Sequence, residues 1–203
     1  MREVQINPIP LDRLAQMLEA DRVSRLAEHA ARARAMLGKR TVWNVNATAS
    51  GGGVAEMLQT LLAYSRGAQV DTRWLVLDGT PGFFRLTKRL HNRLHGVEGD
   101  GGPIGEDERG LYERVLAENL STLRETVRAG DIVILHDPQT AGLAHGLREM
   151  GAHPVWRCHI GRDTPNENSE VAWQFLRPYV EQAQATVFSR SQYAPAWLNR
   201  DSL

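Results

Sequence analysis

Three consecutive glycines stand between a strand-like and a helix-like segment of this sequence. Gly51, Gly52 and Gly53 follow the β-rich residues 41–46 and precede apolar residues at helical spacing. Glycine destabilises a regular element by roughly 0.5–1 kcal/mol relative to alanine, so its use here indicates that something approaches the backbone closely. Because free amides at a helix N-terminus attract anions, the pattern is typical of a turn that receives a phosphate. A tight turn without a ligand is the alternative.

The glycine turn differs from two better-known phosphate motifs. No glycine-lysine-serine/threonine ending follows it, and in G-x-G-x-x-G register Glu56 replaces the third glycine, which argues against a dehydrogenase. Glu56 falls in the first turn of the expected helix. There we expect it either to interact with the helix dipole and the free amides, or to face the crevice and accept a hydroxyl from a ligand.

An imidazole and a carboxylate lie at the C-terminal end of the most apolar strand-like segment of the chain. Residues 131–137 end in His136 and Asp137, and Pro138 and Gln139 follow. Ionisable groups at the end of a buried strand indicate a functional site more than packing. The alternative is structural, with Asp137 capping the next helix and His136 paired to it.

A further group of polar side chains lies around residue 160. Within ten residues the sequence places Arg157, His159, Arg162, Asp163 and Asn166. Alternation along a strand puts Arg157 and His159 on the same side, where they supply two hydrogen-bond donors. Cys158 then points to the opposite face, which argues against a Cys–His catalytic pair and favours a buried, inert thiol.

These groups need a scaffold that brings them together. Strands are expected at residues 41–46, 72–78, 131–137, 153–160 and 185–189, and helices at residues 54–62, 82–96, 106–129, 140–150 and 171–182. Strands that alternate with helices predict a doubly wound, mainly parallel α/β sheet with helices on both faces. Ligands of such sheets bind at the carboxyl ends of the strands, so we expect the polar groups along one edge.

The chain is expected to divide into a short extension and one domain. Residues 1–40, with apolar residues at helical spacing, are predicted to form a helical extension packed on the same domain. Residues 41–203 are predicted to form a Rossmann-like domain. The glycine-rich residues 96–105 are expected to be a loop inserted in that domain.

The composition excludes several classes of function. The 24 basic and 24 acidic residues cancel, so no global field favours nucleic acid or a membrane surface as a partner. The single cysteine excludes an internal disulfide, nowhere do 18 apolar residues run together, and the cytoplasm is the expected location. His91 and His95 have a helical spacing that suits zinc but no third ligand, so no metal site is predicted. No motif of a catalytic nucleophile appears.

Six segments of the chain resemble a single family. They read, in order, "VWNVNATASGGGVAEMLQTLL", "FFRLTKRLHNRLHG", "VILHDPQTAGL", "WRCHIGRDTPN", "WQFLRPYVEQAQATVFS" and "SQYAPAWL". Together they resemble the N-terminal half of glycosyltransferring trehalose synthases, retaining enzymes of the GT-B fold that join glucose from a nucleotide sugar to free glucose. The resemblance implies a glucosyltransferase with a UDP-, ADP- or GDP-glucose substrate, and neither a cofactor nor a metal.

The resemblance also implies roles for particular residues. Gly51, Gly52 and Gly53 would approach the donor diphosphate and sugar, and the catalytic pair would be His159, beside the transferred glucose, and Arg157. The acceptor sugar would lie among Lys88, His91, Asn92, His136, Asp137 and Gln139, with Glu56 joining them. Where members of the family often read "CHID", this chain has Gly161, and Asp163 is the candidate replacement for the missing carboxylate.

A GT-B enzyme has a second α/β domain that holds the nucleotide, and the resemblance implies that this domain lies outside the 203 residues. The expected partners are therefore sugars, nucleotide sugars and the C-terminal domain, in the same chain or in another. The alternative is a non-catalytic module that binds sugar or forms a homodimer through Trp197 and Leu198.

Overall fold

The computed structural model of the chain describes residues 1–198, and within them six strands form one sheet in the order β1-β3-β2-β4-β5-β6. The strands are β1 (Arg2–Val4), β2 (Val42–Asn46), β3 (Thr72–Val76), β4 (Ile132–His136), β5 (His153–Cys158) and β6 (Ala185–Phe188). The strands from β2 to β6 run parallel, and β1 pairs antiparallel with β3 at the edge. The predicted mainly parallel α/β sheet is confirmed.

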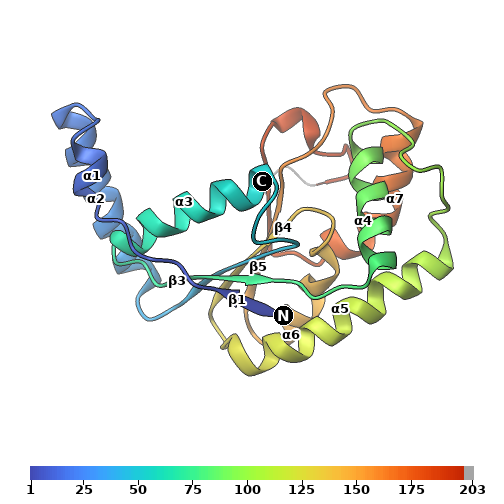
Figure 1. The fold of residues 1–203 in the computed structure, drawn as a ribbon, viewed down its shortest axis with the longest axis horizontal. Coiled ribbons are helices and arrows are strands. Elements are labelled where there is room, and N and C mark those ends of the chain that lie inside the picture. The colour runs from blue at the N-terminus through green and yellow to red at the C-terminus, as the bar shows by residue number, and fades with distance from the viewer. Residues whose placement is uncertain (199–203) are drawn as a thin grey trace.

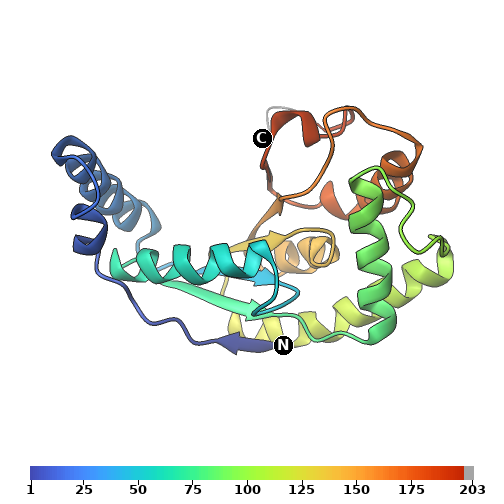
Figure 2. The same ribbon diagram turned by 45° about the horizontal axis from the view of Figure 1, so that its top comes forward.

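Helices cover both faces of this sheet. They are α1 (Asp12–Ala15), α2 (Ala20–Leu37), α3 (Gly53–Gly67), α4 (Pro81–Leu94), α5 (Glu106–Thr126), α6 (Ala144–Glu149) and α7 (Glu167–Val180). Helix α3 lies on one face, and α5 and α6 lie on the other, as Figures 1 and 2 show. Two separate apolar clusters result, one under α3 and a larger one among α4, α5, α6 and α7. Among the described residues, no helix has the length and apolarity needed to cross a membrane.

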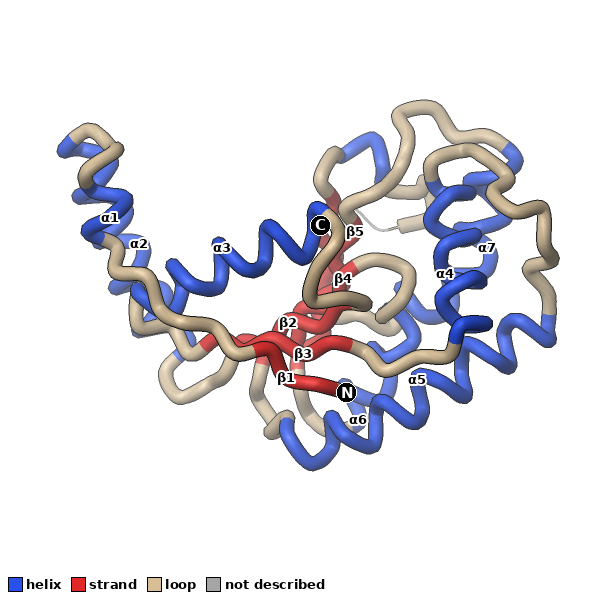
Figure 3. Tube along the Cα trace, viewed as in Figure 1, coloured by secondary structure: helices blue, strands red, loops and turns tan. Residues whose placement is uncertain are grey.

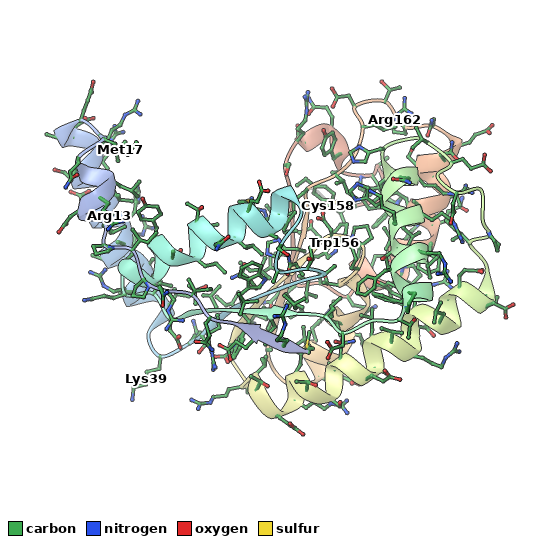
Figure 4. All side chains as sticks on the ribbon, viewed as in Figure 1. Arg13, Met17, Lys39, Trp156, Cys158 and Arg162 are labelled. Carbon is green, nitrogen blue, oxygen red and sulfur yellow. The ribbon has the colours of Figure 1, made fainter. Side chains whose placement is uncertain are left out.

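Aromatic side chains fill the larger cluster. Trp156, on β5 between β4 and the edge strand β6, is fully buried, and its ring packs edge-on against Trp173 and Phe188 at centroid distances of 6.1 and 5.9 Å. Figure 4 places Trp156 in the middle of the body. Trp197 and Leu198 pack half-buried against the same cluster, with the Trp197 ring 6.1 Å from that of Trp173. These two residues are thus partly covered by their own domain, and their role in forming a homodimer stays a prediction.

The first 40 residues are not entirely helical. Arg2–Val4 add a strand to the sheet, held by two hydrogen bonds of 2.7 and 2.6 Å from Arg73 on β3 to the Glu3 carboxylate. Three residues are too few to show an alternating pattern, so this strand could not be predicted from local periodicity. The predicted helices follow as α1 and α2, which stand away from the sheet (Figures 1 and 2). Met17, between them, is 81% exposed and is labelled in Figure 4.

The strand order changes direction at one point. From β2 the chain moves outward to β3, then returns past β2 to β4 and continues to β5 and β6. The loops that leave β2 and β4 therefore turn to opposite faces of the sheet, which opens a crevice between them. Figure 3 shows both loops at the same edge of the sheet, where the carboxyl ends of the strands lie.

Candidate functional site

A cleft of about 280 Å³ occupies this crevice. Its volume is just below the range of small-molecule pockets, roughly 300–1,000 Å³. It is lined by Asn46, Ala47, Thr48, Gly51, Gly52, Gly53, Val54, Ala55, Lys88, His91, His136, Asp137 and Gln139. The cleft thus brings together the glycine turn, the end of β4 and one side of α4, which lie far apart in the sequence.

The glycine turn leaves the start of α3 bare. Gly51 has φ +74°, in the left-handed region that favours glycine, whereas Gly52 is extended with φ 171°. No side chain caps the helix, which begins at Gly53, and a Cβ atom added at any of the three glycines would meet nothing within 4 Å. The first amides of α3 therefore have open space in front of them, as an anion at a helix N-terminus requires.

Asp137 makes the sharp turn at the end of β4. Its φ is +61°, which is rare for a residue other than glycine. Its carboxylate Oδ1 accepts a hydrogen bond of 2.8 Å from the His159 amide, and its carbonyl accepts one of 3.0 Å from Trp156 Nε1. Because the carboxylate reaches across to the end of β5, the capping interpretation is wrong. Burial raises the pKa of Asp137 to about 6, against the opposing effects of this hydrogen bond and of Arg157.

Two histidines from neighbouring strands are hydrogen bonded to each other. His136 Nδ1 lies 2.9 Å from His159 Nε2, and His136 Nε2 lies 3.1 Å from Asn44 Oδ1. Burial lowers the pKa of His136 to about 3 and that of His159 to about 4, and the positive charge of Arg157 acts in the same direction. Both rings are therefore neutral at neutral pH and present hydrogen-bonding groups without charge.

The stability of the protein is expected to fall as the pH is lowered from 6.5 toward 4, above all through His136. Because its pKa in the folded protein is about 3, below the ordinary 6.5, the unfolded chain takes up the proton first. The contribution of neutral His136 to the free energy of unfolding is fully present above pH 6.5. As the pH falls, this contribution decreases by up to about 1.4 kcal/mol per pH unit. Asp137 acts oppositely between pH 3.8 and about 6, which offsets part of the effect.

Urea unfolding at a series of pH values measures this dependence. His136→Gln removes the titrating group while keeping an amide that can hydrogen bond, so its free energy of unfolding should change less steeply over the same range. Equal slopes for the two proteins would contradict the assignment.

The structure does not bring every predicted site residue to the lining of the cleft. Glu56 is exposed in the first turn of α3. Asn92 lines a neighbouring hollow beside Phe84 and Asp100. Asp163 is exposed and forms an ion pair of 3.0 Å with Arg190. These three residues are not among the lining residues of the cleft, and their contact with the acceptor stays a prediction.

The two predicted catalytic residues lie at the margin of the cleft, on β5 and just after it. Arg157 is half-buried, with Nη2 3.8 Å from the Met57 sulfur, and His159 is half-buried against His136. Cys158 points into the core, where its thiol lies 3.1 Å from the Ile160 carbonyl and burial raises its pKa well above the usual value. Its side chain is therefore a packed, inert thiol, as predicted.

Sequence reasoning assigned no role to two asparagines of β2, of which Asn46 lines the cleft. Asn44 and Asn46 are both 3% exposed and lie on the same side of β2. Asn44 contacts His136, and Asn46 Oδ1 accepts a hydrogen bond of 2.8 Å from Trp74 Nε1. The signal was present, because asparagine at alternate positions of a buried strand is costly unless it is hydrogen bonded.

Metal binding finds no support in residues 1–198. In this range no group of three or more histidine, cysteine, aspartate or glutamate side chains is placed to hold an ion. The rings of His91 and His95 do lie side by side, 5.0 Å apart. Burial and the nearby Lys88 lower the pKa of His91 to about 4, so that ring enters the cleft as a neutral group.

The strand order and the position of the cleft define a Rossmann-like α/β domain. A solved structure described as "OtsA apo structure" shares the fold, with a TM-score of 0.51 at 16% identity over 76% of this chain and 41% of that one. The family model "Trehalose synthase, N-terminal domain" matches residues 44–195. The chain therefore belongs to the family of trehalose synthase N-terminal domains, as the resemblance indicated.

Curated relatives agree with this assignment. Trehalose synthase of Rubrobacter xylanophilus is 37% identical over 157 residues, which are 76% of this chain and 36% of that protein. Trehalose synthase of Pyrococcus horikoshii is 34% identical over 191 residues, which are 94% of this chain and 43% of that protein. The chain thus spans about two fifths of the length of these relatives.

Proposed function

We propose that these 203 residues are the acceptor-side half of a retaining glucosyltransferase that forms trehalose from nucleotide-activated glucose and free glucose. The observation that supports this most strongly is the composition of the cleft walls. One wall is an uncapped helix N-terminus with three bare glycines, and the other carries histidine, lysine and glutamine side chains. A diphosphate requires the first kind of surface, and sugar hydroxyls require the second.

In this proposal, positioning and charge stabilisation carry the reaction. The amides and the dipole of α3 stabilise the negative charge that develops on the departing diphosphate. His159 lies beside the transferred glucose, with Arg157 next to it on the strand, while Lys88, His136 and Gln139 hold the hydroxyls of the acceptor. The departing phosphate accepts the proton of the attacking hydroxyl, so the protein needs no nucleophile of its own.

We assign the nucleotide of the donor to a second α/β domain, supplied by the same chain or by another. The lengths of the relatives support this, since 57% of the Pyrococcus horikoshii protein lies outside the matched part (100% minus 43%). The volume of the cleft, about 280 Å³, supports it too, because this is small for a complete nucleotide sugar.

The 203 residues alone are expected to release no trehalose from UDP-, ADP- or GDP-glucose and glucose, because half of the contacts to the transition state are missing. Fused ahead of the unmatched C-terminal part of the Pyrococcus horikoshii relative, they should gain this activity with at least one of the three donors. We call this fusion the completed enzyme.

Trehalose release measured by chromatography separates the outcomes, with the C-terminal part alone as the control. Transfer by the 203 residues without a partner would contradict the proposed division of labour. A completed enzyme that is folded but inactive with all three donors would contradict the proposed reaction.

A further inference from the structure

A continuous chain of hydrogen bonds runs under the cleft from β2 to the end of β5. The Thr72 hydroxyl donates to the Val42 carbonyl at 3.1 Å, and Asn44 Nδ2 donates to Thr72 Oγ1 at 3.4 Å. Asn44 Oδ1 then lies 3.1 Å from His136 Nε2, and His136 Nδ1 lies 2.9 Å from His159 Nε2. Thr72, Asn44 and His136 are between 1% and 3% exposed, so water does not compete for these contacts.

The direction of each bond follows from the first one. The only hydroxyl proton of Thr72 points to a carbonyl, so its oxygen accepts from the amide group of Asn44. That leaves the amide oxygen of Asn44 toward His136, whose Nε2 must therefore carry the proton. A neutral imidazole has one N–H, so His136 Nδ1 is an acceptor and His159 Nε2 is the donor to it.

The ring geometry agrees with this order. The planes of His136 and His159 differ by 14° and their centroids are 5.2 Å apart. With a nitrogen–nitrogen distance of 2.9 Å, these values describe two rings joined edge to edge in nearly one plane, as a linear hydrogen bond requires. A second proton on His136 would have to sit on Nδ1, where it would face the N–H of His159, and burial lowers both pKa values far enough to keep the two rings neutral.

We propose that Asn44, oriented by Thr72, is a positioning residue that fixes the proton of His159 on Nε2, so that Nδ1 of His159 serves as a hydrogen-bond acceptor for a substrate hydroxyl. Nδ1 of His159 has no hydrogen-bond partner among residues 1–198, and the ring is half-buried at the margin of the cleft. The assignment of protons stands on the geometry of this chain. The substrate hydroxyl rests on the proposed function.

A hydrogen-bond acceptor at Nδ1 of His159 favours a substrate group that can donate a hydrogen bond, whereas an N–H group there would favour a substrate group that accepts one. A sugar hydroxyl can donate to Nδ1, whereas a fluorine in its place can only accept, and two acceptors facing each other lose the hydrogen bond. At the hydroxyl that contacts His159, deoxy and deoxyfluoro sugars should therefore be equally poor substrates. With the opposite tautomer, the fluorinated sugar would be accepted better than the deoxy sugar.

Two substitutions of Asn44 separate the positioning role from a structural one. Asn44→Leu keeps the approximate volume and removes the acceptor for His136, whereas Asn44→Asp keeps an oxygen acceptor at the same place. Nitrogen-15 spectra of the 203-residue chain with labelled histidine report which ring nitrogen carries the proton. In the unmodified chain and in Asn44→Asp, we expect Nε2–H on both histidines with slow exchange of both protons. In Asn44→Leu, we expect the His136 Nε2–H signal to be lost to fast exchange.

The completed enzyme supplies the second readout. Asn44→Leu should lower kcat/KM by roughly 10–100-fold, by analogy with the hydrogen-bond partners of metal-ligating histidines, while Asn44→Asp retains most of the activity. An Nδ1–H signal from His159 in the unmodified chain, or an unchanged His136 signal in folded Asn44→Leu, would overturn the inference. If the completed enzyme made no trehalose, the proposed function would fail, and the spectra would still decide the hydrogen-bond chain.

Discussion

Gly52→Val is expected to lower kcat/KM of the completed enzyme by roughly 100-fold or more while leaving the fold intact, since small displacements of bound reactants cost about this much. The space that a side chain would enter is the space proposed for the diphosphate, because a Cβ atom at Gly52 meets no other atom within 4 Å. The backbone tolerates the change, because a φ of 171° is ordinary extended geometry for valine. The loss should therefore appear in donor use and not in stability.

The matched control is Gly105→Val. Gly105 also precedes a helix, α5, with an extended φ of −131°, and a Cβ atom there would lie 3.5 Å from the Glu108 side chain, an ordinary contact. Both variants give up glycine for valine before a helix, so their melting temperatures should fall by similar small amounts. Only Gly52→Val should lose transfer. Normal turnover by folded Gly52→Val would show that the phosphate does not use this turn.

Trp156→Ala is expected to lower the free energy of unfolding by about 3–5 kcal/mol, a large share of the roughly 5–15 kcal/mol that stabilises a domain. The side chain is fully buried among Trp173 and Phe188, and its removal leaves a cavity that the sheet cannot close. It also removes the indole N–H that holds the Asp137 carbonyl, so the turn after β4 should lose its unusual φ of +61°. Denaturant unfolding followed by fluorescence measures the stability.

Trp156→Phe separates packing from the hydrogen bond. It keeps most of the apolar volume and loses only the indole N–H, a difference of about 0.5–1.5 kcal/mol for one hydrogen bond. The Asp137 carbonyl still faces the Thr140 hydroxyl at 3.2 Å, so it is not left without a donor. Equal losses for the alanine and phenylalanine variants would mean that the hydrogen bond, and not burial, dominates at this position.

Most of the scaffold follows from local pattern. The apolar run at residues 131–136 forms β4, and α3 begins at the glycine turn, as predicted. Both predictions succeed because the periodicity of apolar residues, the length of a run and the position of glycines are features of a few neighbouring residues. The capping asparagine Asn166 moved the start of α7 to Glu167, four residues before the expected Val171. Edge strand β1 depended on a partner 70 residues away, which local pattern does not contain.

The site was less predictable than the scaffold. His136 and His159 were expected at the same edge from strand ends alone, and the structure places them in contact. The direction in which a helix side chain points is set by packing, so Asn92 turned to a neighbouring hollow although His91 faces the cleft. The role of Asn44 was not predicted, because it depends on which strands lie beside β2. The pairing of β2 with β3 and β4 is set by the whole sheet and not by the residues near Asn44.

A crystal structure of the completed enzyme with a nucleoside diphosphate and trehalose tests the central claim most directly. The account predicts a phosphate within hydrogen-bond distance of the backbone amides at the start of α3, and a glucose unit against His136 and His159. A diphosphate bound elsewhere, with the cleft beside Gly52 closed by side chains of the protein itself, would contradict it.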